Sequence, residues 1–270
     1  MKTVTQEIKS FFQMKKLPFG KEVKLEELFI QNSLSKAEQK LHLLIETKGL
    51  GILTGRPGTG KSSIIRSLIN QLNPSLYKPV YLCHTSVGVT EFYFHICNAF
   101  ALDAPSRKAK MFGLVKEHVI NLNHSNRIHP ILIIDEAHLL QIDILKEIRL
   151  LTNFEVDSYN GLTVLLCGQD DLHSKLTLTI LEALASAITI SIKMESLSAE
   201  ESYSYIEHRI NTVREVKDPL FTKNALKLIH ESSGGNMRSI NTIATASLYK
   251  AFYSKSIQIE KEHVASAIQR

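Results

Sequence analysis

The chain has 270 residues, of which 44% are apolar, enough for one large domain or a large and a small one, and this composition excludes wholesale disorder. The net charge is +5 and the pI is about 9.0, a mild excess that fits a nucleic-acid partner and also many proteins without one. Cys83, Cys97 and Cys167 lie among apolar residues without metal-ligand or redox spacing, as expected in a reducing compartment. No apolar stretch approaches the ~20 residues of a membrane span, and Met1–Phe12 lacks a signal-peptide run, so we expect a cytoplasmic protein.

Short aliphatic runs alternate with longer helical patterns through the first two thirds of the chain. The runs are Leu50–Leu53, Val80–Cys83, Ile131–Ile134, Thr163–Cys167 and Ile188–Ile192. Four or five aliphatic residues between Gly, Pro or polar residues indicate strands that are buried on both faces. The intervening stretches are long enough for crossover helices, so the pattern predicts an α/β fold with a parallel sheet flanked by helices.

The pattern after Ile192 is helical. Ser198 and Glu201 form a capping-box signature for a helix toward Val213, and Thr222 can cap a second helix through Ser232. A third helix is expected from Met237 and a short one over Glu260–Gln269, with a possible strand at Ile257–Ile259. We therefore predict an α/β core over residues 1–195, including an N-terminal extension, and a helical lid over residues 196–270.

A glycine-rich loop follows the first predicted strand. Its sequence, Gly55-Arg56-Pro57-Gly58-Thr59-Gly60-Lys61-Ser62, matches the Walker A pattern. Glycines let successive backbone N–H groups turn inward toward a phosphate, and the helix that follows adds its positive N-terminus. Lys61 is expected to reach the β- and γ-phosphates and Ser62 to offer its hydroxyl to Mg²⁺. The predicted ATP-binding residues are Gly55, Arg56, Pro57, Gly58, Thr59, Gly60, Lys61, Ser62 and Ser63.

The third aliphatic run ends in a pair of carboxylates. Ile131–Ile134 delivers Asp135 and Glu136 to the carboxyl end of a buried strand, where ligands of open α/β sheets collect. Asp135 is the expected Mg²⁺ ligand, through water, and Glu136 the expected general base that polarises the attacking water. His138 follows in the string Asp-Glu-Ala-His, and the sequence gives it no role.

Two further polar residues are candidates for the catalytic set. Gln169 follows Gly168 at the end of the fourth run, where a side chain can sense the γ-phosphate or hold the lytic water; the alternative is an ordinary loop glutamine. Arg238 begins a helix after Gly234-Gly235, where it could reach the phosphates from the lid; the alternative is a surface arginine. The predicted catalytic residues are Lys61, Glu136, Gln169 and Arg238.

The order of these motifs resembles the ExeA-type AAA+ ATPases. The resemblance includes Leu17-Pro18-Phe19, the Walker A loop, Asp135-Glu136-Ala137-His138, Arg149-Leu150-Leu151-Thr152-Asn153-Phe154-Glu155, Gly168-Gln169 and Ser233-Gly234-Gly235 with Arg238. It implies a P-loop AAA+ sheet with an all-α lid, ATP and Mg²⁺ as cofactors, and ATP hydrolysis. Phe19 is expected either to pack on the adenine ring or to be a plain core aromatic residue.

The family has two uses that differ in their partners. ExeA/GspA secretion ATPases continue into a membrane helix and a peptidoglycan-binding domain; we expect neither in this chain, and this counts against a secretion function. Short relatives resemble the transposition regulators TnsC, TniB, MuB and IstB, and length and mild basicity favour that group. This resemblance implies ATP-driven assembly with itself into a ring or filament around duplex DNA, and activation of a DDE transposase, without a membrane partner.

Two features depart from this pattern. Relatives carry an arginine finger before the last core strand, where this chain has Ala185-Ser186-Ala187-Ile188; Lys175 and Arg209 are weak substitutes, and slow hydrolysis is the alternative. In the proteins that this chain resembles, residues after the second strand contact the DNA backbone; the matching region here, His84–Thr90, contains no lysine or arginine. The candidate DNA contacts are Arg107, Lys108, Lys110 and Lys116, which could equally form a solvated helix face.

Three hypotheses therefore stand after the sequence. The first is a DNA-associated AAA+ regulator of transposition. The second is a secretion or envelope-assembly ATPase, and the third is a nucleotide-binding switch in signalling or defence that hydrolyses little ATP.

Overall fold

The computed structural model describes residues 3–30, 33–216 and 218–269, and these divide into two compact units. One unit comprises residues 35–56 and 64–194 and contains the sheet. The other comprises residues 1–34, 57–63 and 195–270 and is helical. Each unit is described by itself below.

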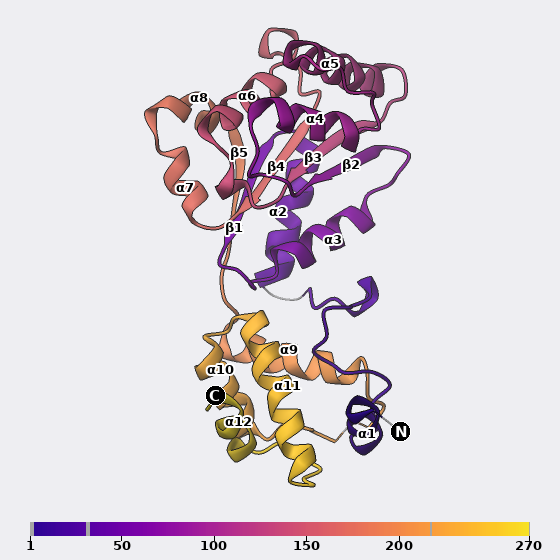
Figure 1. Ribbon diagram of the computed structural model, residues 1–270, viewed down its shortest axis with the longest axis vertical. Coiled ribbons are helices and arrows are strands. Elements are labelled where there is room, and N and C mark those ends of the chain that lie inside the picture. Colours follow the sequence, from indigo (N-terminus) through magenta and orange to yellow (C-terminus); the bar gives the residue numbers. More distant parts are fainter. Residues whose placement is uncertain (1–2, 31–32, 217, 270) are drawn as a thin grey trace. The chain divides into compact units, whose positions relative to one another are not determined.

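The sheet is parallel and has the order β2-β3-β4-β1-β5 (Figure 1). Its strands are β1 (Leu50–Gly55), β2 (Tyr77–Leu82), β3 (His129–Ile134), β4 (Thr163–Gly168) and β5 (Ile188–Met194). Each contains one of the five aliphatic runs, except that Cys83 of the second run follows the end of β2, so the predicted α/β fold is confirmed. β4 lies between β1 and β3, with Leu166 opposite Ile52 on one side and Ile134 on the other.

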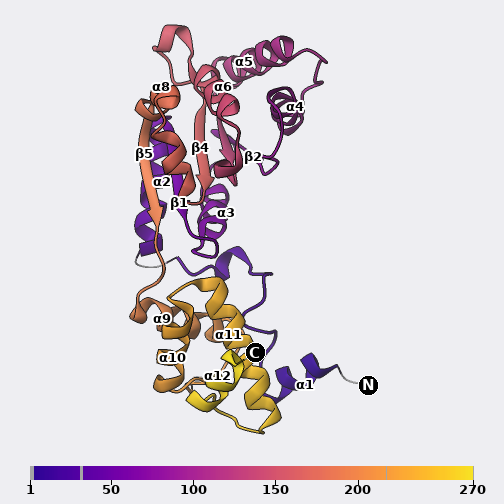
Figure 2. The ribbon, with the colours of Figure 1, turned by 60° about the vertical axis from the view of Figure 1, so that its left-hand side comes forward.

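Helices cover both faces of the sheet (Figure 2). They are α2 (Ser33–Thr47), α3 (Lys61–Gln71), α4 (Val89–Ala99), α5 (Lys108–His124), α6 (Ile142–Thr152), α7 (Asp171–Leu176) and α8 (Glu182–Ser186). Ile52, Leu132 and Leu166 form one buried cluster with residues of α4, α5 and α6. On the other face, a Cβ at Gly51 would come within 2.4 Å of Leu44 in α2, so the absence of a side chain there lets this helix approach β1 closely.

The expectation that all five runs are buried on both faces is wrong for the two edge strands. β1, β3 and β4 are buried throughout, but Thr189, Ser191 and Lys193 of β5 are exposed, and so is Tyr81 of β2. An edge strand has a neighbour on one side only, so helices cover it incompletely and polar side chains are tolerated there.

The helical unit contains the four predicted C-terminal helices. They are α9 (Ala199–Asn211), α10 (Lys223–Ser233), α11 (Met237–Tyr253) and α12 (Lys261–Ile268). Ser198 accepts from the N–H of Glu201 and the Glu201 carboxylate accepts from the N–H of Ser198, which is the expected capping box. The possible strand at Ile257–Ile259 is reduced to a single bridge between Ile259 and Phe221.

The N-terminal segment packs with these helices. α1 (Val4–Phe11) contacts α11 through an edge-to-face pair of Phe11 and Phe252, and the N–H of Lys15 donates to the carbonyl of Val213. Phe29 packs on Tyr205 in the same way. Residues 1–34 therefore group with the C-terminal helices in the structure, whereas the sequence interpretation joined them to the core; the boundary near residue 195 stays a prediction.

The first residue of β3 is a buried histidine whose two ring nitrogens are both partnered. His129 is 4% exposed, with Nδ1 3.0 Å from Oδ1 of Asn123 and Nε2 2.9 Å from Oγ1 of Thr163. Burial, helped by the positive charge of Lys48, lowers the pKa of His129 to about 4 from its ordinary 6.5. The ring is therefore neutral in the folded protein at neutral pH.

His129 should make stability fall with acidification. The ring of His129 takes up a proton at a higher pH in the unfolded chain than in the folded one. The contribution of neutral His129 to the free energy of unfolding is therefore complete above pH 6.5 and is lost as pH falls toward about 4. The shift corresponds to about 3 kcal/mol of unfolding free energy, to be measured by urea unfolding at several pH values. His129→Gln should flatten this dependence, and an unchanged pH slope in that variant would show that other groups cause it.

Candidate nucleotide site

The glycine-rich loop has the backbone conformation that a phosphate cradle needs. β1 ends at Gly55 and α3 begins at Lys61, so the loop opens a helix as predicted. Gly58 and Gly60 have φ of +86° and +97°, a region that residues with a Cβ rarely adopt. Lys61 is half-buried and Ser62 exposed in the first turn of α3, where helix N–H groups favour an anion.

Asn236, which sequence reasoning missed, binds this loop directly within the helical unit. Its Nδ2 donates to the carbonyl of Pro57 at 2.7 Å, and its Oδ1 accepts from the N–H of Arg238 at 3.1 Å. A Cβ at Gly58 would lie 2.5 Å from Oδ1 of Asn236 and 2.7 Å from Cβ of Arg238. The side chain of Arg238 thus starts beside the loop, which is what its predicted role requires. The sequence signal was an N-cap residue after Gly234-Gly235.

Asp135 lies at the end of β3 with both carboxylate oxygens engaged. Oδ2 accepts from the Tyr81 hydroxyl at 2.6 Å, and Oδ1 accepts from the N–H of Glu136 at 2.9 Å. Burial and this hydrogen bond raise the pKa of Tyr81 far above its ordinary value, so Tyr81 remains a donor. Tyr81 comes from the neighbouring strand β2, and nothing in the sequence pointed to it.

The chemistry of this corner fits Mg²⁺. Among the residues that the structure describes, no group of three His, Cys, Asp or Glu side chains could hold a metal by itself. Mg²⁺ keeps several waters and takes one or two protein ligands together with phosphate oxygens, so such a cage is not required. Asp135 keeps a spare lone pair on each oxygen and suits the ion, which would neutralise phosphate charge when bound. Ser62 has the exposed hydroxyl that its predicted role requires, and its part in the site stays a prediction.

Glu136 has a backbone conformation that is uncommon for its residue type. Its φ of 52° and ψ of 34° are left-handed, which costs a residue with a Cβ about 1 kcal/mol. Such strain is often found at functional positions. The side chain is 50% exposed, and Oε2 lies 3.4 Å from Nδ1 of His138. An accessible carboxylate at a strand end can accept a proton from water, as the predicted general base must.

The end of β4 lies against the turn that follows Glu136. The N–H of Gln169 points to Nδ1 of His138 at 3.4 Å, and Lys175 of α7 donates to the carbonyls of His138 and Leu140. His173 of the same helix is 3.0 Å from the hydroxyl of Thr54, next to Gly55 in β1. The side chain of Gln169 is half-buried beside Asp170, whose Oδ1 is buried without a partner in the described part of the chain. The ends of β1, β3 and β4 are thus joined by side chains.

A family comparison identifies the fold to which this geometry belongs. Residues 43–176 match the model of the AAA domain. The chain has the P-loop AAA+ fold. The chain is also 32% identical over 253 residues to general secretion pathway protein A of Aeromonas hydrophila, covering 92% of this chain and 46% of that protein. It therefore spans about half the length of that relative, and the predicted similarity to ExeA/GspA proteins is confirmed.

Solved structures show the same AAA+ fold at low sequence identity. Cdc6p of Pyrobaculum aerophilum has a TM-score of 0.71 and 18% identity, over 93% of this chain and 69% of that chain. The ORC1 protein of Aeropyrum pernix, in complex with DNA, has a TM-score of 0.67 and 15% identity, over 90% of this chain and 66% of that chain. AAA+ P-loop NTPases in general hydrolyse ATP with Mg²⁺.

Lys175 and Arg209, the two weak candidates for an AAA+ arginine finger, both donate hydrogen bonds to groups of this chain. Lys175 donates to the two carbonyls described above. Arg209 is 7% exposed and donates from Nε to Pro18 O at 2.8 Å, from NH2 to Gly20 O at 2.9 Å and from NH1 to the Tyr205 hydroxyl at 3.0 Å. Arg209 therefore fixes the N-terminal segment to α9.

The four candidate DNA contacts differ in how free their charges are. They lie at the start and middle of α5: Lys108 forms an ion pair with Glu147, and Lys116 donates to the carbonyl of Asn153, 3.5 Å above the Phe154 ring centroid. Burial lowers the pKa of Lys116. Arg107 and Lys110 are exposed, so they suit phosphate contacts better than Lys108 and Lys116.

Phe19 is 7% exposed and packs edge-to-face on Phe221, with ring centroids 6.2 Å apart. This packing agrees with the plain core reading, and the adenine contact stays a proposal.

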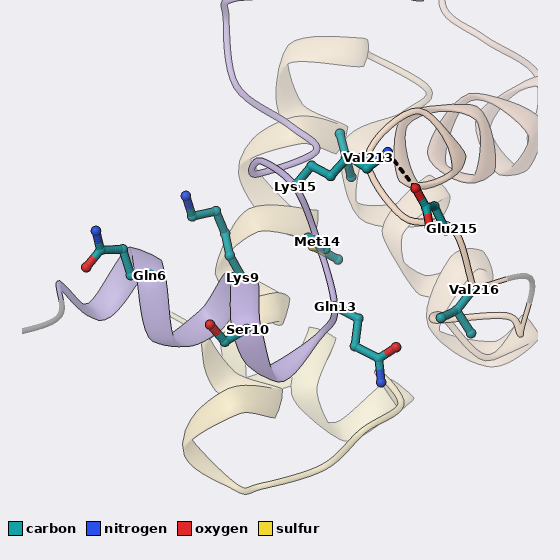
Figure 3. A pocket seen from close by; sticks show the side chains of 9 residues that line it. All are labelled: Gln6, Lys9, Ser10, Gln13, Met14, Lys15, Val213, Glu215 and Val216. Atoms are coloured by element: carbon teal, nitrogen blue, oxygen red, sulfur yellow. Dashed lines mark ion pairs between the residues drawn. The ribbon is translucent and has the colours of Figure 1, made fainter.

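An open groove of about 780 Å³ lies elsewhere in the helical unit, along the polar face of α1 (Figure 3). Gln6, Lys9 and Gln13 are among the residues that line it, and two other lining residues, Lys15 and Glu215, form an ion pair at 2.6 Å. None of the predicted site residues lines this groove.

No helix in the described ranges is long and apolar enough to cross a membrane.

Gly58→Ala should weaken nucleotide binding by at least about tenfold. The added Cβ is strained at this φ and collides with Asn236 and Arg238, and a penalty of about 1.4 kcal/mol suffices for that factor. Titration with a fluorescent ATP analogue measures the effect. Gly113→Ala is the matched control, because Gly113 lies inside α5 with nothing within 4 Å of a Cβ, and should be neutral or stabilising by about 0.5–1 kcal/mol.

Arg209→Ala should lower the unfolding free energy by about 3 kcal/mol, because two carbonyls and a hydroxyl lose a buried charged donor. Arg209→Lys should not restore it, since an ammonium cannot reproduce the fork of a guanidinium. Denaturant unfolding measures both, with exposed Lys227→Ala as a control that changes little. Normal stability with abolished turnover would instead make Arg209 an arginine finger.

Proposed function

We propose that this protein is a cytoplasmic AAA+ ATPase that binds ATP and Mg²⁺, assembles on duplex DNA and regulates transposition. In this proposal it selects target DNA and activates a DDE transposase. The observation that carries the ATPase step is the set of phosphate loop, Asp135 and Glu136 on an AAA+ fold.

ATP hydrolysis in this proposal divides the work among the predicted residues. The residues from Gly55 to Ser63 hold the phosphates, with Lys61 as the point charge, and Asp135 with Ser62 holds Mg²⁺. Glu136 takes the proton of the attacking water. Gln169 orients that water, and Arg238 contacts the phosphates. Proximity of Arg238 and Asn236 to Gly58 supports the last assignment.

DNA binding is supported by charge and by likeness of fold. The chain is basic, Arg107 and Lys110 present exposed charges at the start of α5, and the similar ORC1 fold was solved in complex with DNA. Phosphate contacts of this kind carry affinity without sequence preference, and they weaken with salt. The transposase partner rests on the motif resemblance alone.

A secretion ATPase is the second candidate, and a specific observation favours it. The curated relative at 32% identity is general secretion pathway protein A. This function would use a protein partner in place of DNA as the activator. A nucleotide switch with little hydrolysis is also compatible with the engaged Lys175 and Arg209 and with the finger position being Ala185-Ser186-Ala187.

ATP turnover measured with and without duplex DNA, at low and moderate salt, tests the proposal. We expect DNA to stimulate turnover several-fold, and this stimulation to fade with salt as counterions compete for the phosphates. Lys61→Ala and Glu136→Gln should abolish the stimulation of turnover by DNA. Arg107→Ala with Lys110→Ala should reduce the stimulation while leaving the basal rate unchanged.

Turnover that ignores DNA at every salt concentration would reject the DNA-associated function and favour the secretion reading. Absence of turnover with normal ATP binding would favour the switch. A DNA effect that survives the Arg107/Lys110 variant would move the DNA contacts to another surface.

A further inference from the structure

His138 is buried between two residues of the proposed catalytic set. It is 8% exposed and sits in the 3-10 helix η2 (Ala137–Leu139), directly after Glu136. Its Nδ1 lies 3.4 Å from Oε2 of Glu136 and 3.4 Å from the backbone nitrogen of Gln169. One ring atom thus faces both the proposed general base and the peptide of the proposed water-orienting residue.

The fold holds this ring in place from its backbone as well. Lys175 donates to the carbonyl of His138. Gly168 makes room for the residue, since a Cβ there would lie 3.0 Å from the nitrogen of His138 and 3.3 Å from its Nδ1. The backbone at the end of β4 therefore packs directly against the turn that follows Asp135 and Glu136, because Gly168 has no side chain.

We propose that His138 is a positioning residue for ATP hydrolysis, whose Nδ1 links the carboxylate of Glu136 to the strand end that carries Gln169. This inference rests on ATP hydrolysis at the proposed site, and it is independent of DNA and of the biological partner. It assigns His138 no contact with ATP or with the attacking water.

The chemistry of a neutral imidazole makes the two contacts exclusive. One ring nitrogen carries the proton and the other accepts. With the proton on Nε2, Nδ1 accepts from the N–H of Gln169 and offers no donor to Glu136. With the proton on Nδ1, the ring donates to Glu136 and gives up the bond to Gln169. The two distances are equal and long for hydrogen bonds, so neither partner dominates the geometry.

This exclusivity couples the two residues. A ligand that draws Gln169 toward it weakens the hydrogen bond from that peptide to Nδ1, and this favours the tautomer with the proton on Nδ1, which donates to Glu136. A ligand that draws Glu136 has the opposite effect. The position of the general base thus depends on the position of the strand end, and a misplacement of about 1 Å at such a base can cost a hundredfold in rate.

Steady-state ATP turnover without DNA tests this role through matched variants. His138→Leu should lower kcat by at least about tenfold with KM within about twofold, because the phosphate-binding residues are untouched. His138→Asn places a polar atom close to the position of Nδ1 and should recover most of kcat. His124→Asn, on an exposed histidine of α5, is the control and should have no effect.

A double-mutant cycle separates positioning from packing. Because His138 acts through Glu136, adding His138→Leu to Glu136→Gln should cause no further loss of residual turnover. A multiplied loss, or a parallel fall of kcat, nucleotide affinity and melting temperature in both the Leu and the Asn variants, would make His138 a packing residue and overturn the proposal.

Nitrogen NMR of histidine-labelled protein provides a readout that needs no turnover. The Nδ1 resonance of His138, assigned with His138→Asn, should shift when ATPγS and Mg²⁺ are added, as the ring changes partner. An unchanged resonance under saturating ATPγS would overturn the proposal even in a slow enzyme. Loss of DNA stimulation alone would leave these results unaffected and would reject only the DNA-associated function.

Discussion

The parallel pairing of β4 between β1 and β3 is the constraint on which the site depends. All three strands are buried along their whole length and run in the same direction, so their carboxyl ends meet at one edge of the sheet. That edge delivers the start of the phosphate loop after Gly55, the carboxylates after Ile134 and Gln169 after Gly168. Three segments far apart in the chain thereby meet at one edge, as the proposed ATP hydrolysis requires.

Side-chain hydrogen bonds also join these strand ends, in addition to the backbone hydrogen bonds of the sheet. His173 links α7 to Thr54 of β1, Lys175 links the same helix to the turn after β3, and Tyr81 of β2 holds Asp135. Glu136 is left-handed within this network. Strain of this kind persists only where neighbouring contacts fix it, so the network and the unusual backbone of the proposed base belong together.

In the helical unit, the N-terminal segment is part of the packing and not an appendage. Arg209 binds two carbonyls of that segment, and edge-to-face aromatic pairs join it to α9, α11 and the residue before Thr222. Within the same unit, Asn236 donates to the carbonyl of Pro57. Asn236, the N-cap residue of α11, therefore also contacts the phosphate loop, and Arg238 lies in the first turn of the helix that Asn236 caps.

The sequence by itself determined the five strands, the C-terminal helices and the phosphate loop, because these depend on local periodicity, caps and glycine spacing. It also placed Asp135, Glu136 and Gln169 at strand ends. Only the tertiary structure decided the partners of these residues and of the phosphate loop. Asp135 contacts Tyr81, Gln169 contacts His138, and Pro57 of the loop contacts Asn236. Each of these pairs is far apart in the chain, so local patterns do not reveal the contact. The tertiary structure also decided that parts of β2 and β5 are exposed. These strands lie at the edges because of the strand order, and the strand order depends on pairing between distant segments.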